Sequence, residues 1–138
     1  MMYPQSSINI ARKINGKINS HLVLEKSVTD NSRWIVITGH SATDLILNTL
    51  GDKDKKKIMT SVFDNPFIIQ EILRSCQIPQ TSGYRKINSL IQDGLLIKQG
   101  HVTIDGKKVD KYKSLFKEFV IGIEKNSVFI KAKVSSGP

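Results

Sequence analysis

The spacing of apolar residues changes at Gly94, and this change limits the folds open to the chain. Before it, residues 79–93 carry apolar side chains at helical spacing and open with Pro79, which suits a first helical turn. Gly94 is expected to end this helix in the left-handed conformation. After it, the residues along 95–98, 101–104 and 109–113 favour strands. Asp105-Gly106 favours a tight hairpin turn, so the sequence predicts a helix that leads directly into a β-hairpin.

Three more helices are predicted before this point. Ser41 as N-cap and Gly51 as stop delimit a helix over 42–50. The next helix, over 52–63, has one apolar stripe formed by Ile58, Met59, Val62 and Phe63. Asn65-Pro66 favours the opening of a third, whose apolar face ends near Cys76. The order helix, helix, short turn, helix, hairpin is that of a winged helix-turn-helix.

Strand-like segments flank this unit on both sides. Residues 21–25 and 33–38 predict one hairpin, with turn-forming residues at 29–32 between them. Residues 118–123 and 128–134 predict a second, turning at 125–127. The fold class expected is therefore α+β, a winged helix-turn-helix with flanking β-hairpins. Its parts are a loose N-terminal segment (1–20), a β-hairpin extension (21–40), the winged helix-turn-helix (41–116), and a C-terminal β-hairpin and tail (117–138).

The helix over 79–93 has two chemically distinct faces. A helical projection centred on Ile87 gathers small and apolar residues around it and places hydroxyl, amide and guanidinium groups on the far side. Such groups hydrogen-bond to base edges and phosphates, so this helix is the predicted recognition helix for the DNA major groove. The hairpin over 95–113 is the predicted wing, placed on the DNA backbone or minor groove. The predicted DNA-binding residues are Thr81, Ser82, Tyr84, Arg85, Lys86, Ser89, Gln92, Lys98, Lys107, Lys108 and Lys111.

The charge of the chain favours a polyanionic partner. Lysine and arginine number 21 against 12 aspartate and glutamate, which gives a formal net charge of +9. Nucleic acid and an anionic membrane surface both attract such a protein, and lysine also serves plain solubility. No apolar run reaches the ~20 residues of a membrane span, so we expect a cytoplasmic protein with no membrane partner.

Two segments resemble ArsR-type winged-helix transcription regulators. Leu47–Ile58 resembles the opening helix of that family, and Ile78–Leu96 resembles its recognition helix and first wing strand. The pair Tyr84-Arg85, and Gly106-Lys107-Lys108 followed by Tyr112 and Ser114, are similar to archaeal members. The resemblance covers roughly residues 45–116 and implies operator binding, usually as a homodimer. Metal-sensing members carry a Cys-x-Cys pair near the second helix, and residues 65–73 contain no cysteine.

Catalytic and metal chemistry find little support in the sequence. The single cysteine, Cys76, and the histidines His21, His40 and His101 are scattered without metal-ligand spacing. No phosphate-binding glycine loop or nucleophile elbow is present in the sequence. We therefore expect no enzyme activity, no cofactor and no metal site.

Two other functions fit a winged helix. A protein-interaction module of the transcription machinery is the main alternative, and it should expose apolar residues on the third helix. A single-strand or RNA binder would need exposed aromatics on a sheet, and aromatics make up 7% of the chain. Double-stranded DNA is the expected partner. A homodimer is also expected, through the apolar runs 34–37 and 119–123, unless these runs pack on the protein's own core.

Overall fold

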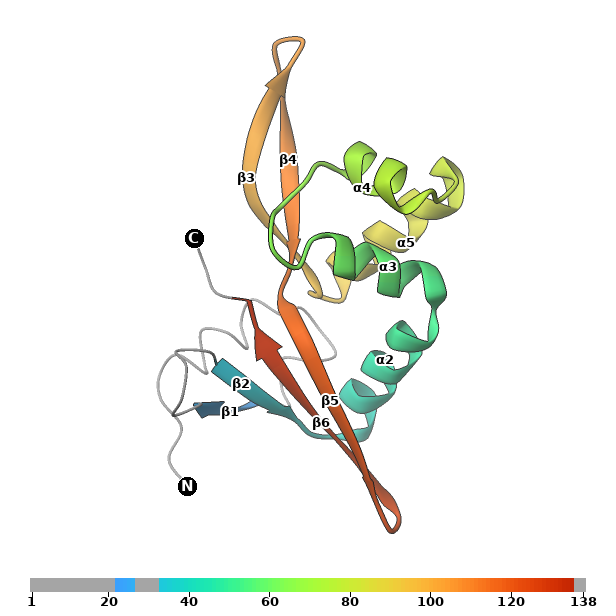
Figure 1. The fold of residues 1–138 in the computed structure, drawn as a ribbon, viewed down its shortest axis with the longest axis vertical. Helices are drawn as coiled ribbons and strands as arrows, with labels where there is room; N and C mark the ends of the chain where they lie inside the picture. Colours follow the sequence, from blue (N-terminus) through green and yellow to red (C-terminus); the bar gives the residue numbers. More distant parts are fainter. Residues whose placement is uncertain (1–21, 27–32, 136–138) are drawn as a thin grey trace.

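The computed structural model describes residues 22–26 and 33–135, and within them the chain is a mixed α+β protein (Figure 1). The helices are α2 (His40–Gly51), α3 (Lys53–Ser61), α4 (Ile69–Cys76) and α5 (Gln80–Gln92). The strands are β1 (Leu22–Lys26), β2 (Arg33–Ile37), β3 (Leu96–Ile104), β4 (Lys107–Ser114), β5 (Phe116–Glu124) and β6 (Ser127–Val134). The predicted loose segment 1–20, the turn at 29–32 and His21 lie outside the described residues.

The two flanking hairpins form one sheet rather than two separate extensions. Strands β1, β2, β6 and β5 lie in that order, and all neighbours are antiparallel. β2 pairs with β6 along its whole length, with Ile35 opposite Ala132 and Ile37 opposite Ile130. Backbone hydrogen bonds therefore hold together segments near the two ends of the described residues. Strands β3 and β4 form a second, two-stranded sheet.

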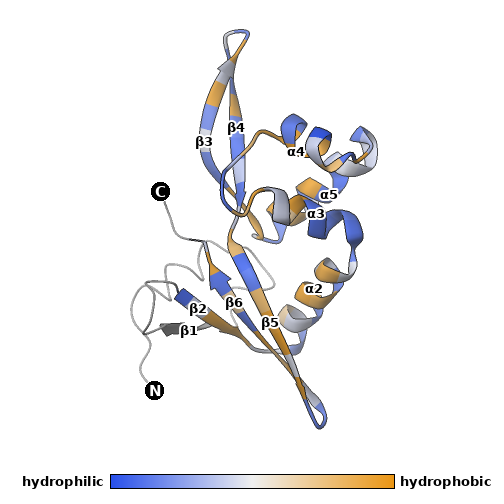
Figure 2. Ribbon diagram, viewed as in Figure 1, coloured by the Kyte–Doolittle hydropathy of each residue, from blue (hydrophilic) through white to orange (hydrophobic). Residues whose placement is uncertain are grey.

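One hydrophobic core joins the four-stranded sheet to the helices. Ile35 and Ile37 are 1% and 2% exposed and lie in the same cluster as Ile46 of α2 and Ile87 of α5. The hypothesis that the run 34–37 is surplus to the protein's own core is therefore wrong for these two residues. In Figure 2, apolar residues colour parts of α2, α5 and the four-stranded sheet, the elements that contribute to this core.

Two predicted helix starts need correction. α2 begins at His40 after Gly39, which has φ 91°, and no side chain caps it, so Ser41 is not its N-cap. Gly51 is the last residue of α2 instead of lying beyond it. α4 begins at Ile69 rather than at Asn65-Pro66, because the backbone of Phe67 exchanges hydrogen bonds of 3.1 and 2.8 Å with Tyr112 of β4. This short bridge ties the α3–α4 connection to the β3–β4 hairpin.

The turns of both long hairpins form where the sequence predicts them. Asp105 and Gly106 connect β3 and β4 with φ values of 51° and 75°, a conformation in which glycine avoids strain. Lys125, with φ 45°, begins the connection of β5 to β6. Gly94, with φ 82°, follows α5 as expected. None of the helices in the described residues has the length and apolar character needed to cross a membrane.

Candidate nucleic-acid interface

Helix α5 has one face in the core and another in solvent. Gly83, Ile87 and Leu90 are buried. The exposed residues Thr81, Arg85, Asn88 and Gln92 follow i, i+4, i+7, i+11 spacing, which places them on one stripe of the helix. We call these four residues the α5 stripe. It combines a hydroxyl, a guanidinium and two amides, and contains no apolar side chain.

Helix α5 packs closely against α4. The turn between the two helices is tight, since Gln77 has φ 56° and the amide of Ile78 donates to the carbonyl of Leu73 at 3.1 Å. A Cβ atom at Gly83 would lie 2.4 Å from a methyl carbon of Leu73 and 3.1 Å from one of Ile78. The absence of a side chain at Gly83 therefore lets α5 approach α4 closely.

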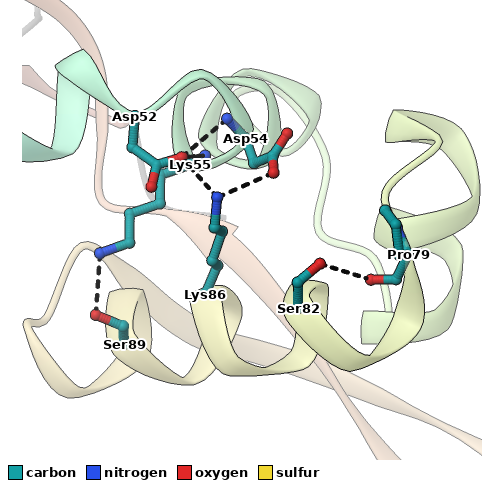
Figure 3. A network of polar contacts seen from close by, with 7 residues as sticks. All are labelled: Asp52, Asp54, Lys55, Pro79, Ser82, Lys86 and Ser89. Atoms are coloured by element: carbon teal, nitrogen blue, oxygen red, sulfur yellow. Dashed lines mark hydrogen bonds and ion pairs between the residues drawn. The ribbon is translucent and has the colours of Figure 1, made fainter.

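Two predicted DNA-binding residues of α5 contact α3 instead of solvent (Figure 3). The Lys86 ammonium lies 3.2 Å from the Asp52 carboxylate and 3.0 Å from that of Asp54. The Lys55 ammonium donates to the Ser89 hydroxyl at 3.1 Å. The Lys86 side chain is only 25% exposed. One contact comes from a lysine of α5 and the other from a lysine of α3. Together they fix the rotation of α5 about its axis.

The electrostatics of this cluster stabilise its charged form. Hydrogen bonds from Lys86 to Asp54 and to Asp52 raise the pKa of the Lys86 ammonium. Burial alone raises the pKa of the Asp52 carboxyl. The amide of Lys55, the hydrogen bond and charge of Lys86, and the amide of Asp54 together outweigh burial and lower that pKa below 3.8. Asp52 also caps α3, because its carboxylate accepts both amides at 3.0 Å.

The projection centred on Ile87 therefore placed the outer face imperfectly. At about 100° per residue, the α5 stripe is centred about 130° from Ile87 rather than 180°. α3 covers the flank that holds Lys86 and Ser89. Asn88 is not among the predicted DNA-binding residues, but it lies inside the stripe. Its helical spacing to Arg85 and Gln92 was the signal that could have identified it.

The remaining predicted residues of α5 have intermediate positions. Ser82 is half-buried and its hydroxyl donates to the carbonyl of Pro79 at 3.4 Å. Tyr84 is half-buried and borders a groove that faces the β3–β4 hairpin. Neither side chain belongs to the exposed stripe, and each lies beside it.

The β3–β4 hairpin carries lysines at its tip and along its strands. Lys107 and Lys108 follow the Asp105-Gly106 turn, are exposed, and make no ion pair with any residue in the described ranges. Lys98 pairs with Asp110 at 3.2 Å, and Lys111 is half-buried. Lys107 and Lys108 are thus the exposed lysines of this hairpin that make no ion pair among the described residues.

A groove of about 470 Å³ separates the hairpin from the helices. Ile68 and Ile69 line it from the start of α4, Tyr84 lines it from α5, and Lys107 and Lys108 line it from the hairpin. The groove thus lies next to α5 and under the lysine-bearing tip. Among the described residues, no cluster of three or more His, Cys, Asp or Glu side chains could hold a metal ion.

Comparison with known proteins gives no relative for this arrangement: no family model, no curated protein and no solved structure matches the chain.

Proposed function

We propose that this chain binds double-stranded DNA and regulates transcription in the cytoplasm, as a winged helix-turn-helix protein. In this proposal α3, α4 and α5 are the three helices of the motif, and α5 enters the major groove. The β3–β4 hairpin is the wing and contacts the sugar-phosphate backbone or the minor groove. Membership in the ArsR-like regulators belongs to the same proposal and rests on the sequence resemblance.

One observation carries the proposal: the α5 stripe and the lysine-bearing tip belong to neighbouring elements. The stripe offers donors and acceptors for base edges at Arg85, Asn88 and Gln92. Lys107 and Lys108 offer cations for phosphates on the hairpin that follows α5 in the chain. A reader of duplex DNA needs both kinds of contact, one to specify the sequence and one to position the protein.

Charge and polarity favour DNA over a protein partner at this surface. The net charge of +9 attracts a polyanion while it is still diffusing toward the protein. Interfaces between proteins concentrate aromatic and apolar anchors at their centre, and the α5 stripe has none. The exposed large apolar residues of the described chain are Ile104, Val120, Ile121, Ile123 and Val128, and none lies on α5.

Fluorescence anisotropy with labelled duplexes tests the proposal. If about four phosphates are neutralised, log affinity should fall with log salt concentration at a slope near −3.6. Raising salt from about 50 to about 200 mM would then weaken binding roughly a hundredfold. Selection from a random duplex pool would yield the preferred site. Binding that is undetectable at low salt, or indifferent to salt, would contradict the proposal.

We also propose that the protein is a homodimer and that the β5–β6 hairpin supplies its interface. Of the two apolar runs considered from the sequence, 34–37 contributes to the core, whereas 119–123 remains largely exposed. Val120 and Ile121 are 44% and 43% exposed, and Ile123 is 78% exposed. A two-fold dimer would bind two half-sites about 34–36 Å apart or a multiple of that distance.

A further inference from the structure

The groove under the β3–β4 hairpin has more apolar lining than a phosphate contact requires. Four aliphatic side chains line it: Ile68, Ile69, Ile104 and Val109. Ile104 is 41% exposed and stands directly before the turn of the hairpin, where a polar residue would cost nothing. A hairpin that touches only phosphates gains little from an exposed isoleucine on this side. The groove therefore offers a surface for an apolar group.

Polar groups with unused hydrogen-bonding capacity surround this apolar surface. Tyr84 and Tyr112 line the groove, and in the described part of the chain their hydroxyls make no hydrogen bond. Lys107 and Lys108 line it as cations. Two carboxylates also reach it, but that of Asp110 is paired with Lys98 at 3.2 Å, which leaves Asp105 as the one opposing charge. The polar lining thus favours an anionic group.

We infer that this groove binds a small organic anion with an apolar body. Its volume of about 470 Å³ lies within the ~300–1,000 Å³ of small-molecule sites. The body would contact the aliphatic side chains, and the anionic group would accept from the Lys107 and Lys108 ammonium groups and from a tyrosine hydroxyl. An apolar surface with a few convergent polar groups is the usual composition of such sites.

A consequence for DNA binding rests on the proposed function. The groove lies between α5 and the β3–β4 hairpin. Lys107 and Lys108, which line it, are the lysines that contact phosphates in the proposed function. A bound anion would occupy these lysines and fill the space beside α5. Duplex and anion would therefore compete, and the anion would act as an inducer that releases the protein from DNA.

Fluorescence titration of the full chain with 1-anilinonaphthalene-8-sulfonate tests the site without DNA. This probe has an aromatic body and one sulfonate, and N-phenyl-1-naphthylamine is the matched compound without the charge. We expect saturable binding at one probe per chain, with the neutral compound at least about fivefold weaker. The double variant Lys107→Gln, Lys108→Gln and the single variant Ile104→Asn should each weaken the probe about tenfold. Tyr84→Phe tests the hydroxyl and should weaken it severalfold.

The control variant distinguishes the groove from the exposed apolar side chains of the β5–β6 hairpin, at the opposite end of the molecule (Figure 1). Ile123→Asn removes an apolar side chain from β5 and should leave the probe affinity unchanged. Probe binding that is lost in Ile123→Asn but retained in Ile104→Asn overturns the assignment, and so does the absence of saturable binding. Circular dichroism of each variant confirms that its fold is intact.

A second arm separates this inference from the proposed function. A labelled duplex at 50 mM salt should bind at least tenfold more weakly in the presence of saturating probe. Probe binding with the expected variant pattern in a protein that binds no duplex would uphold the groove and refute the DNA-binding proposal. Duplex binding that is unaffected by saturating probe would overturn the competition.

Discussion

The two long hairpins of this protein share a backbone plan. β3 and β5 each have nine residues, and β4 and β6 each have eight. Each hairpin closes through a turn that contains a left-handed residue, Asp105 followed by Gly106 in one and Lys125 in the other. They project from opposite ends of the longest axis of the molecule (Figure 1). Strand lengths and turns therefore do not distinguish their roles.

Their side chains and neighbours differ. The β3–β4 hairpin carries Lys107 and Lys108 at its tip and follows α5 in the chain. The β5–β6 hairpin carries exposed aliphatic side chains on both strands, among them Ile123 and Val128, and apolar colour extends along β5 below α2 in Figure 2. One hairpin suits a polyanion and the other an apolar surface. Strand length and turn conformation are alike in the two hairpins, so the proposed partners rest on the chemistry of each surface.

The largest effect should come from polar substitution in the β5–β6 hairpin. Burial of an isoleucine side chain is worth about 1.5–3 kcal/mol, and a two-fold interface contains Ile121 and Ile123 twice. If each gains half of that value, the four side chains contribute about 3–6 kcal/mol. Ile121→Asp with Ile123→Asp should therefore weaken the dimer by about a hundredfold or more. Sedimentation at micromolar concentration measures this change.

The matched control is Ile104→Asp in the other hairpin, which should leave the dimer intact. Ile121 and Ile104 are each more than half covered in the protomer, so urea unfolding of each variant checks that the protomer remains folded. Wild-type protein that sediments only as a monomer, with and without duplex, would refute the dimer. The β5–β6 hairpin would then lose its proposed partner.

The next largest effect concerns α5, the helix that directly precedes the β3–β4 hairpin in the chain. Arg85 lies in the α5 stripe, so Arg85→Ala should cost about 1–3 kcal/mol on the preferred duplex and relax its selectivity. Arg33→Ala removes the same charge from an exposed position in β2 and should leave selectivity unchanged. Competition anisotropy with preferred and random duplexes measures both. Equal effects of the two substitutions would mean that α5 reads no sequence.

A smaller effect compares lysines at the two hairpins directly. Lys107→Ala with Lys108→Ala removes two of the proposed phosphate contacts and should reduce the salt slope by about 1.8. The loss of affinity between about 50 and about 200 mM salt would then fall from roughly a hundredfold to roughly tenfold, alike for all sequences. Lys117→Ala with Lys125→Ala removes the same charge from the β5–β6 hairpin and should leave the slope near its original value. A similar reduction in both pairs would erase the distinction between the hairpins.

The sequence predicted best those features that depend on local chemistry. Gly94 ends α5 and Asp105-Gly106 turns the β3–β4 hairpin because few other residues adopt positive φ without strain. The buried face of α5 followed from helical periodicity, since Gly83, Ile87 and Leu90 share one side. These predictions needed no knowledge of distant parts of the chain.

Features that depend on packing between distant segments were not predictable in the same way. Helical periodicity predicts the outer face of α5 opposite Ile87, but α3 covers one flank and leaves the exposed stripe around Arg85 and Asn88. α4 starts late because Phe67 pairs with Tyr112, 45 positions further along the chain by their numbers. No periodicity within a single segment shows that β2 pairs with β6. Such pairings are tertiary outcomes.

The smallest effect tests how α5 is positioned beside the β3–β4 hairpin. Asp52 caps α3 and pairs with Lys86, so Asp52→Ala should lower the free energy of unfolding by about 1 kcal/mol, the usual value of an N-cap. Loss of the Lys86 contact should also loosen the rotation of α5 and reduce duplex selectivity, while the proposed dimer contact at the distant β5–β6 hairpin stays unchanged. Urea unfolding, competition anisotropy and sedimentation measure the three quantities.

Asp52→Asn separates the charge from the cap, because asparagine caps helices as well as aspartate does. The pKa of the Asp52 carboxyl is lowered in the folded protein, so its charge stabilises the fold above the unfolded value near 3.8. That contribution disappears as the pH falls through the lowered value. The stability difference between wild type and Asp52→Asn should therefore be present at neutral pH and vanish in acid. A stability difference that persists at low pH would show that the Asp52–Lys86 contact does not position α5. Unchanged duplex selectivity in both variants would show the same.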